Sequence, residues 1–353
     1  MHRLELSRVK RTFTTHRVPA AALGWYTPVA QPPAIGDLLV AEVLSLGKHS
    51  SIEDCSGLTL SIFPGDQIVG AFGNRYATDQ YEGYVPEVPV TECDMLSIGG
   101  VCGEVRSAHS SMSVPTRLRV LGAVCDEEGQ PINLATFAIP RRRALPHGQV
   151  ILVVGASMNS GKTTTVGTLV RALTRSGHHV VAAKVTGTAA GKDGRYFASC
   201  GASTVLDFTH CGVPSTYMLA PSELVAIFQR LLSNLYAERP DYIVLEIADG
   251  IFQRETRMLL ASDVVRSSVD HLFFAANDSL SAECGARRLR AEDWPLRAVT
   301  GMVTTSPLAM REVEEEVGLP CLNIEALLSE RLLGLLEHGN SVALGQAAIG
   351  HAA

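Results

Sequence analysis

Residues 155 to 163 encode a loop suited to binding phosphate. They read Gly-Ala-Ser-Met-Asn-Ser-Gly-Lys-Thr and match the pattern G-x-x-x-x-G-K-[ST]. In such a loop the glycines let consecutive backbone N–H groups point at phosphate oxygens, the lysine reaches the β- and γ-phosphates, and the final hydroxyl can bind Mg²⁺. The sequence therefore predicts a nucleotide site, whose phosphate-binding residues are Gly155, Ser157, Asn159, Ser160, Gly161, Lys162, Thr163 and Thr164.

A strand and a helix must position this loop, and the sequence predicts both. Val150 to Val154 is an apolar run typical of a buried strand. Beyond the loop, Val166, Leu169, Val170 and Leu173 recur at helical spacing, and Gly177 stands where a left-handed residue would end the helix. The alternative is a glycine-rich turn that binds nothing. The Gly-Lys-Thr triplet at the start of an amphipathic helix favours the phosphate site.

Two carboxylates stand at the end of a second predicted strand, which runs from Tyr242 to Ile247. Ligands of open α/β sheets bind beyond the carboxyl ends of the strands, and Mg²⁺ prefers oxygen ligands. Glu246 is therefore our first choice for the Mg²⁺ partner and Asp249 the second. The competing interpretation is that Asp249 and Gly250 form only a tight turn.

A second lysine ends the predicted strand from Val180 to Val185. Lys184 could neutralise the charge of a transferring phosphoryl group or hold an anionic substrate, although a solvated lysine at a strand end is the alternative. A charged loop follows, in which Asp193 could bind the metal and Arg195 an oxyanion. We thus predict Lys162, Lys184, Glu246 and Asp249 as catalytic residues and Thr163, Glu246 and Asp193 as Mg²⁺ ligands.

These features together resemble the dethiobiotin synthetase branch of the SIMIBI class of P-loop proteins. The resemblance rests on a P-loop with no lysine before its Gly-Lys-Thr, on Lys184 followed by Gly187, and on Glu246. It implies that the strand-end lysine contacts phosphate and substrate and that the glutamate binds Mg²⁺. Residues 191–202 are also similar to the MobB nucleotide-binding proteins of molybdopterin dinucleotide synthesis. The resemblance covers residues 150 to about 305, and Ala248-Asp249-Gly250 departs from the glycine-rich turn of the dethiobiotin enzymes, which implies a different substrate.

The two halves of the chain have different patterns. We expect an N-terminal arm over 1–34, a β-rich domain over 35–145, a P-loop NTPase domain over 146–338 and a flexible tail over 339–353. Short β-like runs at 38–46, 58–63, 67–72, 117–124 and 134–139 predict a small antiparallel β-barrel or β-sandwich. The alternation of strands and helices afterwards predicts an α/β domain with a mostly parallel sheet. Four polar residues of the β-rich half could line a pocket, namely His49, Glu53, Asp54 and His109, but polar residues near turns are more often solvated, and we interpret them in that way.

Composition narrows the class of partner. The 353 residues carry a formal net charge of −6, which gives no electrostatic footprint for nucleic acid. No apolar stretch approaches the roughly 20 residues that a membrane span needs. The eight cysteines are dispersed without a C-x-x-C pair, which is typical of a reducing cytoplasm. The sequence is compatible with either a monomer or a homodimer.

The function that this pattern favours is an ATP- and Mg²⁺-dependent enzyme. It would transfer the γ-phosphoryl group to an oxygen nucleophile of an anionic small molecule, a carboxylate or carbamate, as a kinase or as a ligase. The alternative is an accessory protein, as the MobB likeness allows, which couples ATP or GTP binding to cofactor synthesis or to a partner protein.

Overall fold

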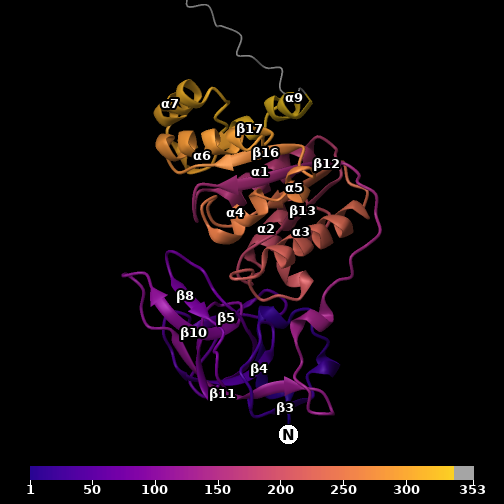
Figure 1. Cartoon of the computed structure of the whole chain (residues 1–353), viewed down its shortest axis with the longest axis vertical. Coiled ribbons are helices and arrows are strands. Elements are labelled where there is room, and N and C mark those ends of the chain that lie inside the picture. The colour runs from indigo at the N-terminus through magenta and orange to yellow at the C-terminus, as the bar shows by residue number, and fades with distance from the viewer. Residues whose placement is uncertain (338–353) are drawn as a thin grey trace, which may run out of the picture.

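The first half of the chain closes into a β-barrel, which the computed structural model shows beneath the second half in Figure 1. The structure describes residues 1–337. Strand β11 pairs with β4, β4 with β7, β7 with β10, β10 with β9, and β9 again with β11, so the ring has no free edge. The strands of this half are β1 (His2–Arg3), β2 (Val9–Arg11), β3 (Trp25–Thr27), β4 (Leu38–Ser45), β5 (Ser51–Glu53), β6 (Thr59–Ser61), β7 (Gln67–Phe72), β8 (Tyr81–Tyr84), β9 (Glu92–Met95), β10 (Val101–Ala108) and β11 (Thr116–Cys125).

Strand β4 shows why this half is built of short apolar runs. Leu39, Ala41 and Val43 pack into one cluster of buried residues, whereas Leu38 and Val40 pack into another on the opposite face. A strand with apolar cores on both faces reads as a continuous apolar run and not as an alternating one.

The barrel differs from the predicted one in three respects. Its sheet is mixed and not purely antiparallel, because β7 pairs in parallel with both β10 and β2. Residues 1–34, expected as an arm, contribute β1, β2 and β3 to the sheet. The run at 134–139 is not a strand, because the Asn133 side chain accepts the Ala135 N–H and caps a 3₁₀ helix, η4 (Leu134–Phe137).

The second half is a six-stranded, fully parallel sheet with helices on both faces. Its strand order is β14-β13-β15-β12-β16-β17. The elements are β12 (Gln149–Gly155), β13 (Val180–Lys184), β14 (Val205–Asp207), β15 (Tyr242–Glu246), β16 (His271–Ala275) and β17 (Leu296–Thr300), with α1 (Lys162–Arg175), α2 (Lys192–Cys200), α3 (Pro221–Tyr236), α4 (Arg254–Leu260), α5 (Asp263–Arg266), α6 (Ser279–Ala291), α7 (Pro307–Val317), α8 (Ile324–Leu327) and α9 (Arg331–Glu337). The remaining 3₁₀ turns are η1 (Leu6–Arg8), η2 (Phe13–Thr15), η3 (Ala20–Ala22), η5 (Phe208–Cys211) and η6 (Met302–Thr305).

Strand β12 has a core on each side, as the central strand of such a sheet requires. Ile151 and Val153 pack with the apolar face of α1, whereas Val150, Leu152 and Val154 pack in the cluster that contains α3 and α6. The arrangement is the α/β fold predicted for this half. Residues 138–148, between the two halves, contain no helix or strand. The tail predicted from residue 339 lies outside the described residues. No helix within residues 1–337 is long and apolar enough to cross a membrane.

Candidate functional site

The predicted phosphate loop joins β12 to α1 at the carboxyl edge of the sheet. Within it Asn159 (φ 62°) and Gly161 (φ 98°) adopt the left-handed conformation. Left-handed residues in such a loop turn successive N–H groups toward one point, which makes a nest for an anion. A side chain at Gly161 would lie 2.9 Å from the Gly301 Cα atom, so this position also needs glycine for space. The backbone therefore has the form that phosphate binding requires.

Some of the predicted loop residues line a cavity and others do not. Asn159, Gly161, Lys162, Thr163 and Thr164 line one cavity. The remaining predicted loop residues do not line it: Gly155 ends β12, the exposed Ser157 donates its hydroxyl hydrogen to Asn277 Oδ1 (3.0 Å), and Ser160 is buried.

Lys162 crosses the loop. Its Nζ donates to the Ser157 carbonyl at 2.7 Å. Burial lowers the pKa of this lysine, and the carboxylates of Glu246 and Asp249 act against that shift. The ammonium group therefore lies where phosphate oxygens would compete for it.

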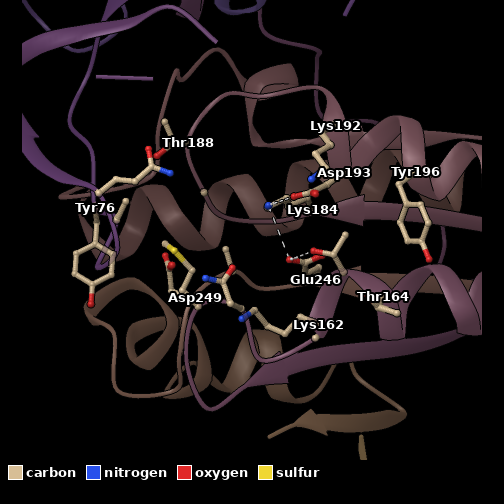
Figure 2. A pocket seen from close by; sticks show the side chains of 18 of the residues that line it. Tyr76, Lys162, Thr164, Lys184, Thr188, Lys192, Asp193, Tyr196, Glu246 and Asp249 are labelled. Atoms are coloured by element: carbon tan, nitrogen blue, oxygen red, sulfur yellow. Dashed lines mark hydrogen bonds and ion pairs between the residues drawn. The ribbon is translucent and has the colours of Figure 1, made fainter. Parts of the chain in front are cut away.

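Glu246 and Lys184 meet because they are partners across two paired strands. They end β15 and β13 and lie directly opposite each other in the parallel register. The Thr163 hydroxyl is 3.3 Å from Glu246 Oε1, and Lys184 Nζ is 3.9 Å from the same oxygen. Lys184 also forms an ion pair with Asp193 of α2, as the dashed lines in Figure 2 show. The structure thus brings the predicted lysine and three of the predicted oxygen ligands together.

The charges of this cluster hold one another in place. Burial raises the pKa of Glu246, and the neighbouring Lys184 acts against that shift. Burial likewise disfavours the charge of Lys184, but the carboxylates of Glu246 and Asp193 outweigh it and raise its pKa. At neutral pH Lys184 is therefore a fixed cation inside the cavity.

The oxygen atoms beside the loop fit a bound Mg²⁺. Among the described residues, the buried Oε2 of Glu246 has no hydrogen-bond partner. A buried carboxylate oxygen without a partner is costly unless a cation satisfies it. Thr163 and Glu246 would hold the ion, whereas Asp193 is engaged by Lys184. Asp249 lies on the cavity wall in a turn with φ 60°, and burial raises its pKa.

Glu246→Gln is expected to spare metal-free nucleotide binding and to weaken the Mg²⁺-dependent part by about tenfold or more. The amide keeps the size of the side chain but loses the charge that binds a hard cation. Nucleotide titrations at a series of Mg²⁺ concentrations measure this. Asp249→Asn is the matched variant. If only the Asp249 change alters the Mg²⁺ dependence, Asp249 is the ligand and Glu246 is not.

The barrel supplies one wall of the cavity, which the sequence did not predict. The cavity has a volume of about 750 Å³, and Arg75, Tyr76, Ala77 and Gln80 of the segment between β7 and β8 line it together with the loop. Figure 2 shows Tyr76 at one end and Tyr196 of α2 at the other. Nothing in the sequence around Arg75 marks it, because its position depends on how the barrel closes.

Two polar residues of the barrel, expected to be solvated, are buried. His49 is 6% and Glu53 2% exposed, whereas His109 is exposed. Glu53 Oε2 accepts the Gly191 N–H at 2.9 Å, and its other oxygen pairs with Arg195 of α2. The predicted oxyanion ligand Arg195 is therefore used to join the halves.

Further contacts cross between the halves. The Asn159 amide of the phosphate loop lies 3.3 Å from Asp79 Oδ2. The Tyr217 hydroxyl lies 3.0 Å from that of Tyr84 and donates to Glu82 at 3.3 Å. The barrel therefore contacts both the phosphate loop and the chain that follows β14.

No protein-family model matches the chain, and no curated protein sequence does either. Among solved structures, chloroplast FtsY from Physcomitrella patens is similar, with 16% identity over 53% of this chain and 62% of that one and a TM-score of 0.38. The signal recognition particle 54 kDa protein from Aeropyrum pernix K1, in complex with GDP, has 18% identity over 58% and 53% and a TM-score of 0.37. The kinase domain of the Escherichia coli tyrosine kinase ETK has 16% identity over 43% and 66% and a TM-score of 0.34.

The chain thus spans less than two thirds of each of these structures. The assignment of the second half does not depend on them. The strand, the loop with its two left-handed residues and the helix that Lys162 begins are the parts of a phosphate-binding loop, and the sheet around them is parallel. Residues 149–337 therefore form a parallel α/β fold that carries a phosphate-binding loop.

Proposed function

We propose that this chain is an ATP- and Mg²⁺-dependent enzyme that transfers the γ-phosphoryl group to an oxygen atom of a small molecule. The observation that carries the proposal is the position of Lys184. Its Nζ lies 3.9 Å from the same Glu246 oxygen that the Thr163 hydroxyl contacts. Lys184 and Lys162 both line the cavity. Phosphoryl transfer needs positioning and charge neutralisation more than covalent chemistry.

Each cation of the site has a separate task in this proposal. Lys162 binds the phosphate oxygens within the loop, as its place in the motif requires. Thr163 and Glu246 hold Mg²⁺, which supplies charge neutralisation at the phosphates. The carboxylates of Asp193 and Glu246 hold Lys184 in place, so its ammonium group does not move when the nucleotide binds. A cation fixed in this way stabilises charge that develops during transfer and costs little reorganisation.

The shape of the cavity supports a second substrate. A volume of about 750 Å³ falls within the usual range for small-molecule sites, and its walls come from both halves of the chain. An acceptor that reaches the γ-phosphate from the barrel side would lie between the two halves of the chain, beside Arg75, Tyr76 and Gln80.

Adenine is the base that we propose. Asp278 follows β16, where a base-reading aspartate would stand, but its carboxylate accepts the Ser281 N–H at 2.7 Å and caps α6. The neighbouring Asn277 accepts from Ser157. Both side chains therefore form hydrogen bonds within the protein, which argues against their use in recognising guanine.

Release of ADP from ATP and Mg²⁺, measured with pools of small carboxylic acids and amines, tests the proposal. We expect at least one pool to raise the rate tenfold or more, and a parallel series with GTP to give less. The same pools with the Lys162→Ala protein are the control. A wild-type protein that hydrolyses ATP slowly and responds to no pool would instead favour the accessory protein that couples nucleotide binding to a partner.

A further inference from the structure

A second, smaller cavity adjoins the nucleotide cavity on the barrel side. Its volume is about 370 Å³, and Arg75, Gln80 and Thr188 line both cavities. A small molecule that fills the smaller cavity would therefore extend past these three residues into the larger one. The barrel and the loop after β13 form its walls together.

Arg75 is a buried cation without an ion pair. It is 8% exposed, and no carboxylate among the described residues lies within ion-pair distance of it. Its guanidinium donates to Gln80 Oε1 at 2.8 Å and lies 3.2 Å from His49 Nε2, while its Nε has no hydrogen-bond partner within the described chain. Burial lowers the pKa of Arg75 to about 10 although the charge of Asp79, which lies beyond ion-pair distance, acts against that shift, so the group remains charged at neutral pH. Buried charges of this kind are normally paired.

His49 cannot fully satisfy Arg75. The same Nε2 atom lies 3.2 Å from the Leu96 carbonyl, which requires a donor, whereas Arg75 requires an acceptor. One ring nitrogen cannot serve both. Burial, reinforced by the charge of Arg75, lowers the pKa of His49 to about 4, so the ring is neutral and offers Arg75 no negative charge.

The lining of the smaller cavity has a single sign of charge. It includes Lys48 and Arg75, and no Asp or Glu is among the described residues that line it. The larger cavity, in contrast, contains Asp193, Glu246 and Asp249 beside its lysines. The smaller cavity therefore favours an anion without the help of a bound metal ion, whereas an anion in the larger cavity needs Mg²⁺ to offset the neighbouring carboxylates.

We propose that the smaller cavity binds an oxyanion of the second substrate, a carboxylate or a phosphate group, and that Arg75 is its principal ligand. The planar guanidinium suits either group, because both present two oxygens to its N–H donors. Lys48 adds charge at the exposed side. The proposal rests on the proposed function only in calling this anion a substrate. It makes the substrate a molecule with its anionic group in the smaller cavity and its acceptor oxygen in the larger one.

Calorimetric titration of the full chain tests the site with succinate and with inorganic phosphate as probes. The protein is first saturated with a non-hydrolysable ATP analogue and Mg²⁺, so that the phosphate loop is filled. We expect saturable binding of at least one probe and none of succinamide, which has the shape of succinate without its charge. The probe that binds more tightly shows whether the site prefers a carboxylate or a phosphate group.

Four variants locate the binding. Arg75→Met should weaken it at least tenfold, and Arg75→Lys should weaken it less, because the charge remains without the planar donors. Lys48→Met, at an exposed position, should weaken it by about twofold to fivefold. Arg119→Met, which removes an exposed arginine paired with Glu42 on another face of the barrel, should leave it unchanged.

The outcomes separate this site from the nucleotide site. The Lys162→Ala variant should still bind the anion in the absence of nucleotide. Loss of ATP binding would therefore not remove anion binding, and the two sites can be tested separately. The proposal is overturned if neither probe binds the wild type, or if Arg75→Met and Lys48→Met bind the anion as the wild type does. It is also overturned if Arg75→Met weakens the ATP analogue tenfold, because Arg75 would then be a ligand of the nucleotide.

Discussion

Lys162→Ala is expected to weaken ATP binding at least 100-fold and to abolish turnover. The ammonium group lies inside the phosphate loop, 6% exposed, and no other described lysine reaches the Ser157 carbonyl that it contacts. Hydrogen bonds between a cation and phosphate are among the strong ones, and here they would form in a partly desolvated site. Calorimetric titration with ATP and Mg²⁺ measures the change.

Arg171→Ala is the matched control, because this arginine lies on the exposed face of the same helix. It should leave the affinity within about twofold. Unchanged affinity and unchanged turnover in the Lys162 variant would contradict the P-loop assignment itself.

Lys184→Met should reduce substrate-stimulated turnover by about 100-fold while ATP affinity falls less than tenfold. Methionine keeps the apolar stem and removes a charge that is fixed beside the transferring group, and losses of one such stabiliser are typically 10²–10³-fold. Single-turnover kinetics and nucleotide titration measure the two quantities separately. Thermal unfolding of the variant shows whether the fold survives the loss of the ion pair.

The pH profile of the Lys184 variant distinguishes a direct role from a structural one. Lys184 acts against the raised pKa of Glu246, so its removal should raise that pKa further. Glu246 must be ionised to hold Mg²⁺, and the acid limb of the rate profile should therefore move to higher pH. If the variant turns over like the wild type at every pH, Lys184 serves only as a salt-bridge partner and the enzyme proposal fails.

The centre of the site could be predicted from the sequence because its geometry is local. A phosphate loop lies within nine consecutive residues, and Lys184 and Glu246 end neighbouring parallel strands, whose carboxyl ends always share one edge. Their meeting follows from the topology alone. The roles that we assign to them remain predictions.

The barrel side could not be predicted, because it depends on contacts between distant residues. Arg75 and Gln80 reach the cavity only after β9 and β10 close the ring with β11, and no local pattern marks such a closure. The positions of His49 beside Arg75 and of Glu53 beside Gly191 and Arg195 likewise depend on contacts between residues that are distant in the sequence. The wrong prediction of a strand at 134–139 has a local cause instead. The Asn133 side chain caps a 3₁₀ helix there, and residue propensities alone do not account for such a hydrogen bond.

The Glu53 contact limits how this chain can diverge during evolution. A buried carboxylate that loses its partner is strongly destabilising, so a substitution of Arg195 has to be accompanied by one at Glu53. Gly191, which precedes the helix that carries Asp193, donates its backbone N–H to the same carboxylate, and a Cβ atom at this position would lie 2.5 Å from the Arg195 guanidinium and 3.0 Å from the Glu53 carboxylate. We therefore expect positions 53, 191 and 195 to change together among homologues. By the same reasoning, a barrel exchanged from a distant homologue would displace the helix that holds Lys184, so the two halves are inherited as one unit.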